Sequence, residues 1–465
     1  MASLLPTSST TSSTLTAVSS ASAAYLILLP LLLVHMAVST MGLNPINQFV
    51  ILKVCHELQP NATRPYPVCA KDSDVQTAAA FWVQAISLAI AIPTFFISPL
   101  IGLLLDRVGR RPILFLPFVA VILPAIAVLV IEAYDLGLWL LVLADLVKGC
   151  LGGNAVFVMT VYSMFADLTT GETRTRVFYL KEAFSLFGFS FGPYIGGLLY
   201  ESYGLSTVFT VIIAAELIIV TYGLLFVKES LPESRRKPLI DVSTTLNPLV
   251  HLANSLKSLL KLFSTRTPTI LALINATGAL TQSAYVFIFF FVPSARFGWD
   301  SYESGRFLMV GSFCRFAYFA GIVPFIMHRL LARQNSHDGR VSAELWLIRA
   351  GLVTYVVTLT LFGRVTDGAQ YYYIIPIYSF ASSALPTLRA LLSKTVAQNA
   401  QGQLFASLEV LQSLGSLVSH AVMPIVFRAT VGFMPEAICY IVAAMWGVAL
   451  TATFFVAKGE LVGSD

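Results

Sequence analysis

The stretch GLLLDRVGRRPILF, from Gly102 to Phe115, places four charged residues between two long apolar runs. Charge is scarce elsewhere, since only 11% of the residues are charged and 57% are hydrophobic. Charges this concentrated either end a membrane span or form a working part of the protein. The four residues are Asp106, Arg107, Arg110 and Arg111.

The apolar runs on either side of this stretch recur along the whole chain, and the mean hydropathy is +0.79. A helix needs about 20 predominantly apolar residues to cross a bilayer. The sequence therefore predicts an all-α integral membrane protein with twelve transmembrane helices. The predicted spans are 23–43, 78–103, 113–133, 138–164, 177–200, 205–227, 268–292, 304–328, 343–363, 371–390, 404–427 and 433–457.

Six of these spans precede a polar, basic connector and six follow it. We expect a disordered tail over 1–22, a first six-helix half over 23–227, a linker over 228–266, a second half over 267–457 and a tail over 458–465. Residues 1–22 are rich in Ser and Thr and lack the basic start of a signal peptide.

Lys and Arg are more frequent in the connectors that follow even-numbered spans. An excess of basic residues in short loops marks the cytoplasmic side of a membrane. The pattern predicts that both termini are cytoplasmic, and we expect the protein in the plasma membrane.

The first outward connector holds two further features. Asn61-Ala62-Thr63 is a glycosylation sequon, and it lies between Cys55 and Cys69. A disulfide between them suits an oxidising compartment, and two free thiols are the alternative. A second sequon begins at Asn275, inside a span, where we expect no glycosylation.

The charged stretch follows span two and resembles the signature loop of the major facilitator superfamily. That signature has the form G-x-x-x-D-R-x-G-R followed by Arg or Lys, and here it reads Gly102, Asp106, Arg107, Gly109, Arg110 and Arg111. Gly109 permits a tight turn. Asp106 is suited to cap a helix or to pair with an arginine. The resemblance implies a transporter fold with solute bound between two halves, and ion pairs in this loop that change with conformation.

Two other resemblances narrow the family. Residues 166–183 and 401–417 resemble the proton-coupled folate transporter family, which implies proton-coupled movement of an organic solute. Residues 188–197, GFSFGPYIGG, look like part of the drug-antiporter signature, which implies a hinge suited to export; ordinary close packing is the alternative. The residues concerned are Gly188, Gly192, Pro193, Gly196 and Gly197.

Ionisable residues inside the spans are expensive and should face a cavity or a partner. Asp145 and Lys148 share one face of span four, where they either exchange a proton or form a static ion pair. The drug-antiporter pattern has an arginine where Asp145 stands. The remaining candidates for proton coupling or for the solute cavity are Glu216, Arg315 and Glu409.

These features predict a secondary active, proton-coupled carrier of a small organic solute. Export is preferred, and uptake of a folate-like or other organic anion is the alternative. The sequence has neither a Walker-type phosphate loop nor clustered metal ligands, so we expect no cofactor, no metal and no nucleic-acid partner. We expect a monomer in the lipid bilayer. A non-transporting sensor or a membrane-bound enzyme is the alternative from another class.

Overall fold

The computed structural model of the protein describes residues 10–60, 64–169, 171–236, 266–318, 322, 337–393 and 401–456. Every regular element in these ranges is helical. The first half comprises α1 (Thr10–Met41), α2 (Leu43–Leu58), α3 (Tyr66–Lys71), α4 (Ser73–Val108), α5 (Arg110–Leu114), α6 (Leu116–Tyr134), α7 (Trp139–Cys150), α8 (Gly153–Leu168), α9 (Gly171–Tyr203), α10 (Leu205–Phe226) and η1 (Glu233–Arg235).

In the second half, the first described element begins at Arg266. This half comprises α13 (Arg266–Leu280), α14 (Ala284–Val286), η3 (Phe287–Phe291), α15 (Val292–Phe297), α16 (Ser301–Ala317), α18 (His337–Arg364), α19 (Ala369–Ala381), α20 (Ala384–Ser393), α21 (Gln401–Thr430), α22 (Ala437–Ala452) and η6 (Thr453–Phe455). Most of the predicted linker, and the tail over 458–465, lie outside the described residues.

The described helices confirm a multi-span membrane fold. Eight helical segments are long and apolar enough to cross a bilayer, and a ninth is the pair Arg266–Leu280 and Ala284–Phe297, which bends by 44°. The predicted spans that fall on α9, on α16 and on α19 with α20 are not among these nine. Twelve spans therefore remain a prediction.

The N-terminal segment differs from the expected tail. Helix α1 begins at Thr10, within the segment 1–22 that was expected to be disordered. A helix grows by single residues at little cost once its first turns are fixed. Turns anchored in the predicted first span can therefore extend the helix back into this Ser- and Thr-rich stretch.

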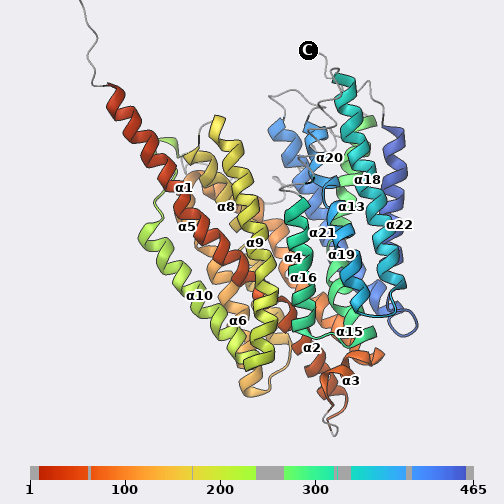
Figure 1. Ribbon diagram of the computed structural model, residues 1–465. Coiled ribbons are helices and arrows are strands. Elements are labelled where there is room, and N and C mark those ends of the chain that lie inside the picture. The colour runs from red at the N-terminus through yellow and green to blue at the C-terminus, as the bar shows by residue number, and fades with distance from the viewer. Residues whose placement is uncertain are drawn as a thin grey trace, which may run out of the picture.

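The helices form two bundles that meet along the α9–α16 and α4–α21 pairs. Figure 1 shows the bundles together at the end that carries α2, α3 and α15, and apart at the end where α1 begins. We call the first the α3 end and the second, which carries the stretch 102–111, the loop end. One large apolar core lies within the first half, which also holds a small cluster of Ile101, Leu105, Ile113 and Val156. The other large core fills the second half and includes Val50, Cys69 and Val75 of the first.

Two helix pairs form the seams between the bundles. Helices α9 and α16 pack through small residues: a Cβ added at Gly305 would lie 2.5 Å from the Pro193 carbonyl oxygen. Helices α4 and α21 meet through polar groups, because Arg428 donates to Gln84 over 2.9 Å and Gln84 donates to the Ala421 carbonyl over 2.7 Å.

Candidate functional site

The loop between α4 and α5 is organised around Arg110. Its guanidinium donates to Asp106 on α4 over 2.8 Å and to Asp167 near the end of α8 over 3.2 Å. Ser230, beyond α10, also donates to Asp167 over 3.0 Å. Asp106 thus pairs with an arginine. The Arg110 side chain is 10% exposed, so this network is partly shielded from water.

Glu229 holds the backbone of the same loop. Its carboxylate accepts hydrogen bonds from the backbone N–H groups of Arg110 at 2.9 Å, Arg111 at 3.1 Å and Leu231 at 3.0 Å. Burial acts to raise the pKa of the Glu229 carboxyl, but these three donors outweigh it, so its pKa is lowered.

Gly109 is required by this geometry. It joins α4 to α5 at φ 114°, in the region that disfavours a side chain. A Cβ there would also lie 2.4 Å from a Glu229 carboxylate oxygen. Gly102 lies on α4, and a Cβ there would meet Met159 of α8 at 3.4 Å. Arg107 occupies the last turn of α4.

Arg111 also donates to the Leu224 carbonyl over 2.6 Å. All contacts described for Arg110 and Arg111 are therefore with residues of the first half. In this conformation the loop therefore braces α4, α5, α8 and the segment after α10 against one another. Sequence reasoning missed Glu229 and Asp167, which lie more than 50 positions from Arg110 and match no part of the signature.

Asp145 and Lys148 lie on α7 as a partly shielded pair. The Lys148 ammonium is 3.8 Å from the Asp145 carboxylate, and the side chains are 25% and 4% exposed, respectively. Helix α7 packs tightly here, since a Cβ at Gly149 would lie 2.6 Å from the Ile90 carbonyl oxygen of α4. The carboxylate is thus enclosed, while its partner reaches the surface.

Glu216 pairs with a residue that the site prediction omitted. His35 Nδ1 of α1 lies 2.9 Å and 3.2 Å from the two carboxylate oxygens of Glu216 on α10. Both side chains are almost completely buried, at 1% and 0% exposure. The rings of Phe118 and Phe157 pack on the imidazole, with centroids at 4.9 Å and 4.1 Å. The pair is sealed inside the first half.

Arg315 on α16 has no acidic partner among the described side chains. Its Nε is buried and lacks a hydrogen bond, and no ion pair to it occurs among the described side chains. It shares one helix face with Ser304, Leu308 and Gly311, at spacings of four, three and four. Ser304 and Gly311 are buried and Arg315 is partly buried, so this helix face is turned toward the interior of the second half.

Aromatic residues surround that interior. The guanidinium of Arg315 lies within electrostatic range of the phenol groups of Tyr285, Tyr355 and Tyr378. Tyr355 stacks on Trp446 with centroids 4.7 Å apart, and Trp446 donates to the Tyr285 hydroxyl over 3.3 Å. We call Tyr285, Tyr355, Tyr378 and Trp446 the tyrosine cluster.

The glycines of α9 serve close packing. Cβ atoms at Gly188, Gly192 and Gly196 would lie within 2.5 Å of backbone oxygens of α1, and one at Gly197 would lie 2.5 Å from the Ser301 carbonyl oxygen. Helix α9 continues without a break through Pro193. Its geometry supports the packing interpretation; the hinge for export stays a prediction.

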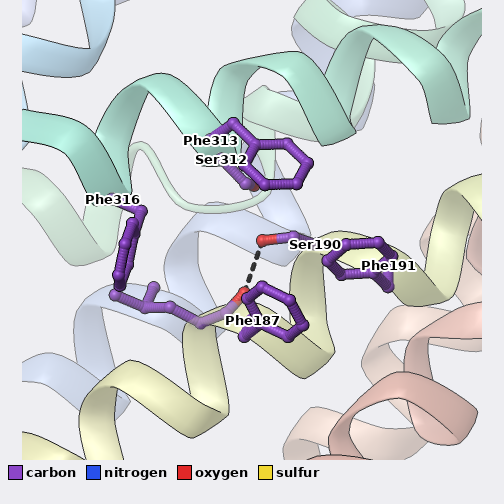
Figure 2. Close-up of a pocket in the computed structure, with 7 residues that line it drawn as sticks. Phe187, Ser190, Phe191, Ser312, Phe313 and Phe316 are labelled. Carbon is purple, nitrogen blue, oxygen red and sulfur yellow. Dashed lines mark hydrogen bonds between the residues drawn. The ribbon is translucent and has the colours of Figure 1, made fainter.

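A small pocket lies on the α9–α16 seam. Figure 2 shows Phe187, Ser190 and Phe191 of α9 facing Phe313 and Phe316 of α16. Its volume is ≈ 10 Å³, which is room for about one water molecule. Sites for organic ligands usually measure about 300–1,000 Å³. This pocket is therefore too small to be the solute site.

Of the remaining predicted residues, Cys55, Cys69 and Asn275 have described side chains, whereas Glu409 and Asn61 do not. Cys55 and Cys69 form a disulfide between α2 and α3. Asn275 is buried on α13, and its side-chain oxygen accepts a hydrogen bond from Arg389 over 3.1 Å. Glu409 lies on α21, but its side chain is outside the described ones, and Asn61 lies outside the described residues.

Comparison with known proteins agrees with this arrangement. The profile of the Major Facilitator Superfamily matches residues 66–420. The chain is 23% identical over 408 residues to a proton-coupled folate transporter of Rattus norvegicus, covering 83% of this chain and 82% of that protein. It is 27% identical over 366 residues to a class C tetracycline resistance protein of Escherichia coli, covering 78% and 84%.

Solved structures share the fold. A human organic anion transporter superposes with a TM-score of 0.61 at 15% identity, covering 92% of this chain and 99% of that one. The nucleoside transporter NupG gives a TM-score of 0.61 at 11% identity, covering 93% and 98%.

Proposed function

The chain belongs to the Major Facilitator Superfamily, whose members are transporters and not enzymes, and we propose that it couples proton movement to transport of a small organic anion by alternating access. The observation that carries this proposal is the division of charge. The first half encloses two carboxylates with basic partners, and the second holds a guanidinium with no counter-ion among the described side chains.

We assign proton coupling to Asp145. A coupling group must gain and lose a proton as its surroundings change. Lys148, its partner, is 25% exposed, so this pair is less enclosed than the pair of Glu216 and His35. Glu216 and His35 are sealed by phenylalanine rings in this conformation, which suits a structural pair. Glu216 is the second candidate for coupling.

We assign the anionic group of the solute to Arg315. A guanidinium in a membrane interior costs at least about 2.5–3.5 kcal/mol on insertion scales, and a bound anion would offset that cost. Arginine binds carboxylates and phosphates with paired N–H donors. The tyrosine cluster offers hydroxyl donors and ring faces to an aromatic solute. The printed names of relatives, a folate transporter and an organic anion transporter, support this class.

We further propose that the α3 end faces outward and that the conformation described is open to the cytoplasm. The supports are the surplus of basic residues at the loop end and the separation of the bundles there (Figure 1). We keep the proposals of a plasma-membrane location, cytoplasmic termini and a monomer.

Direction is proposed as export, with uptake as the alternative. The similarity to tetracycline resistance proteins favours export, and the similarity to folate transporters supports the alternative.

Flux into sealed proteoliposomes tests the proposal. Radiolabelled organic anions, cations and neutral solutes would be offered with and without an imposed pH gradient. We expect accumulation of anions that collapses when a protonophore is added. Anion flux that ignores the pH gradient would remove the coupling, and absence of any flux would favour a sensor on the same scaffold.

A further inference from the structure

The α3 end is closed by a short helix, α3, which is fixed to the first half and contacts the second half. Helix α3 has six residues, too few to be stable alone. The Cys55–Cys69 disulfide fastens it to α2, and Gln76 of α4 donates to the Ala70 carbonyl over 2.7 Å. The helix is therefore fixed to the first half.

Tyr66, the first residue of α3, reaches the second half. Its hydroxyl donates to the Trp299 carbonyl over 3.1 Å and lies 2.8 Å from the Ser294 hydroxyl. Ser294 is completely buried. Because burial raises the pKa of the Tyr66 phenol, the group stays protonated and keeps its donor at neutral pH.

Neighbouring contacts join the same two surfaces. Gln48 of α2 accepts a hydrogen bond from the Ser301 N–H at the start of α16 over 2.8 Å, and Asn44 donates to the Ser301 carbonyl over 3.4 Å. Gly298 stands over α3, since a Cβ there would meet Pro67 at 3.5 Å. All these contacts break if the halves separate at the α3 end.

We propose that α3, with its disulfide and Tyr66, is a latch that sets how often the α3 end opens. The disulfide keeps Tyr66 in position against Ser294 and Trp299, and Tyr66 holds the second half. Tyr66 is thus a positioning residue for the conformational change. The inference rests on the proposed alternating access, but not on the solute or on the coupling ion.

The test measures the separation of the halves at the α3 end by pulsed electron paramagnetic resonance. Labels would be placed by Tyr134→Cys, at the end of α6, and Phe433→Cys, after α21; both side chains are strongly exposed. The free cysteines would first be replaced by alanine; they are Cys150, Cys314 and Cys439. The native disulfide stays intact.

Tyr66→Phe keeps the ring and removes both hydrogen bonds. We expect the ratio of long to short distances to rise about tenfold, the effect of one to two net hydrogen bonds. Cys55→Ser with Cys69→Ser should shift it at least as far in the same direction. Tyr203→Phe, at an exposed end of α9, is the matched control and should leave it unchanged.

An unchanged distance distribution in a folded Tyr66→Phe variant would overturn the latch. Because the readout requires no flux, it separates the two proposals. A shifted distribution in a protein that moves no solute supports the latch and removes the transport proposal.

Discussion

The two halves share an architecture but differ in the charged groups they enclose. The first half holds acid–base pairs, His35 with Glu216 and Asp145 with Lys148. The second holds Arg315, without a described partner, beside a cluster of tyrosines. A buried carboxylate can gain or lose a proton as its surroundings change, whereas a cation without a counter-ion attracts an anion. The difference suggests that the first half handles protons and the second handles solute.

The largest effect is expected for Asp145→Asn. The amide cannot release a proton, and Lys148 loses its counter-ion. We expect pH-driven accumulation to disappear while exchange of solute down its own gradient continues. Flux assays in proteoliposomes with and without a pH gradient measure both activities.

Asp145→Glu is the matched control, because it retains a titratable group on the same face and should keep part of the coupling. Normal pH-driven accumulation in a correctly inserted asparagine variant would make Asp145 a structural residue and move the coupling to Glu216.

Glu216→Leu should lower the stability of the protein more than it affects proton coupling. This result would distinguish the His35–Glu216 pair from the Asp145–Lys148 pair. Removing one member of a buried pair costs about 3–5 kcal/mol, because the other member is left without compensation. Thermal unfolding in detergent should show a large loss. The double variant His35→Leu/Glu216→Leu should be more stable than the Glu216→Leu variant.

Glu201→Leu, at an exposed position of α9, serves as the control for loss of a carboxylate. If Glu216→Leu unfolds like this control, the His35–Glu216 pair does not stabilise the first half.

Arg315→Gln tests the second half. A hydrogen bond to a charged group contributes about 1.5–3 kcal/mol, so the KM for an anionic solute should rise about tenfold or more, with the pH dependence of transport retained. The KM of the Arg315→Lys variant should lie between those of wild type and of Arg315→Gln. Arg306→Gln, on the exposed opposite face of α16, should leave the KM unchanged, and an equal effect of both variants would remove the specific role of Arg315.

Glu229→Gln should have a smaller effect, confined to the loop of the first half. The amide keeps one acceptor oxygen, but it loses the charge and replaces the other oxygen with an NH2 group that cannot accept from a backbone N–H. We therefore expect at least about 1 kcal/mol lower stability at neutral pH. Because folding lowers the pKa of Glu229, its contribution is present above the ordinary pKa and is lost as the pH falls through the folded value. Unfolding curves of wild type and variant should therefore converge in acid; a constant difference at all pH values would contradict this role.

The smallest functional effect is expected for Asn61→Gln, which compares the two sequons. Asn61 precedes α3, whereas Asn275 is buried in the second half. Glycosidase should shift the gel mobility of wild type and of Asn275→Gln, but not of Asn61→Gln, and transport should be unchanged. A shift that persists in Asn61→Gln would reverse the proposed orientation of the α3 end.

Some of this site was accessible from local sequence and some was not. The loop signature predicted a turn at Gly109 and, for Asp106, either a helix cap or a pairing with an arginine; the turn and the pairing are both local features. The signature did not indicate that Glu229 holds the backbone of the loop, since such a contact leaves no trace in spacing. His35 was passed over because a single histidine in a span is usually a packing residue, and its partner lies 181 positions away.

Local sequence was enough to indicate a bundle of membrane-spanning helices with a transporter loop. Span length and apolarity are properties of consecutive residues, and a bilayer of fixed thickness selects them directly. The pairing of the buried charges, the lack of a described partner for Arg315 and the contact of Tyr66 with Ser294 became visible only in the folded protein. These contacts depend on how helices distant in sequence rotate and pack, and the apolar surroundings that make them matter energetically arise only when the bundle has assembled.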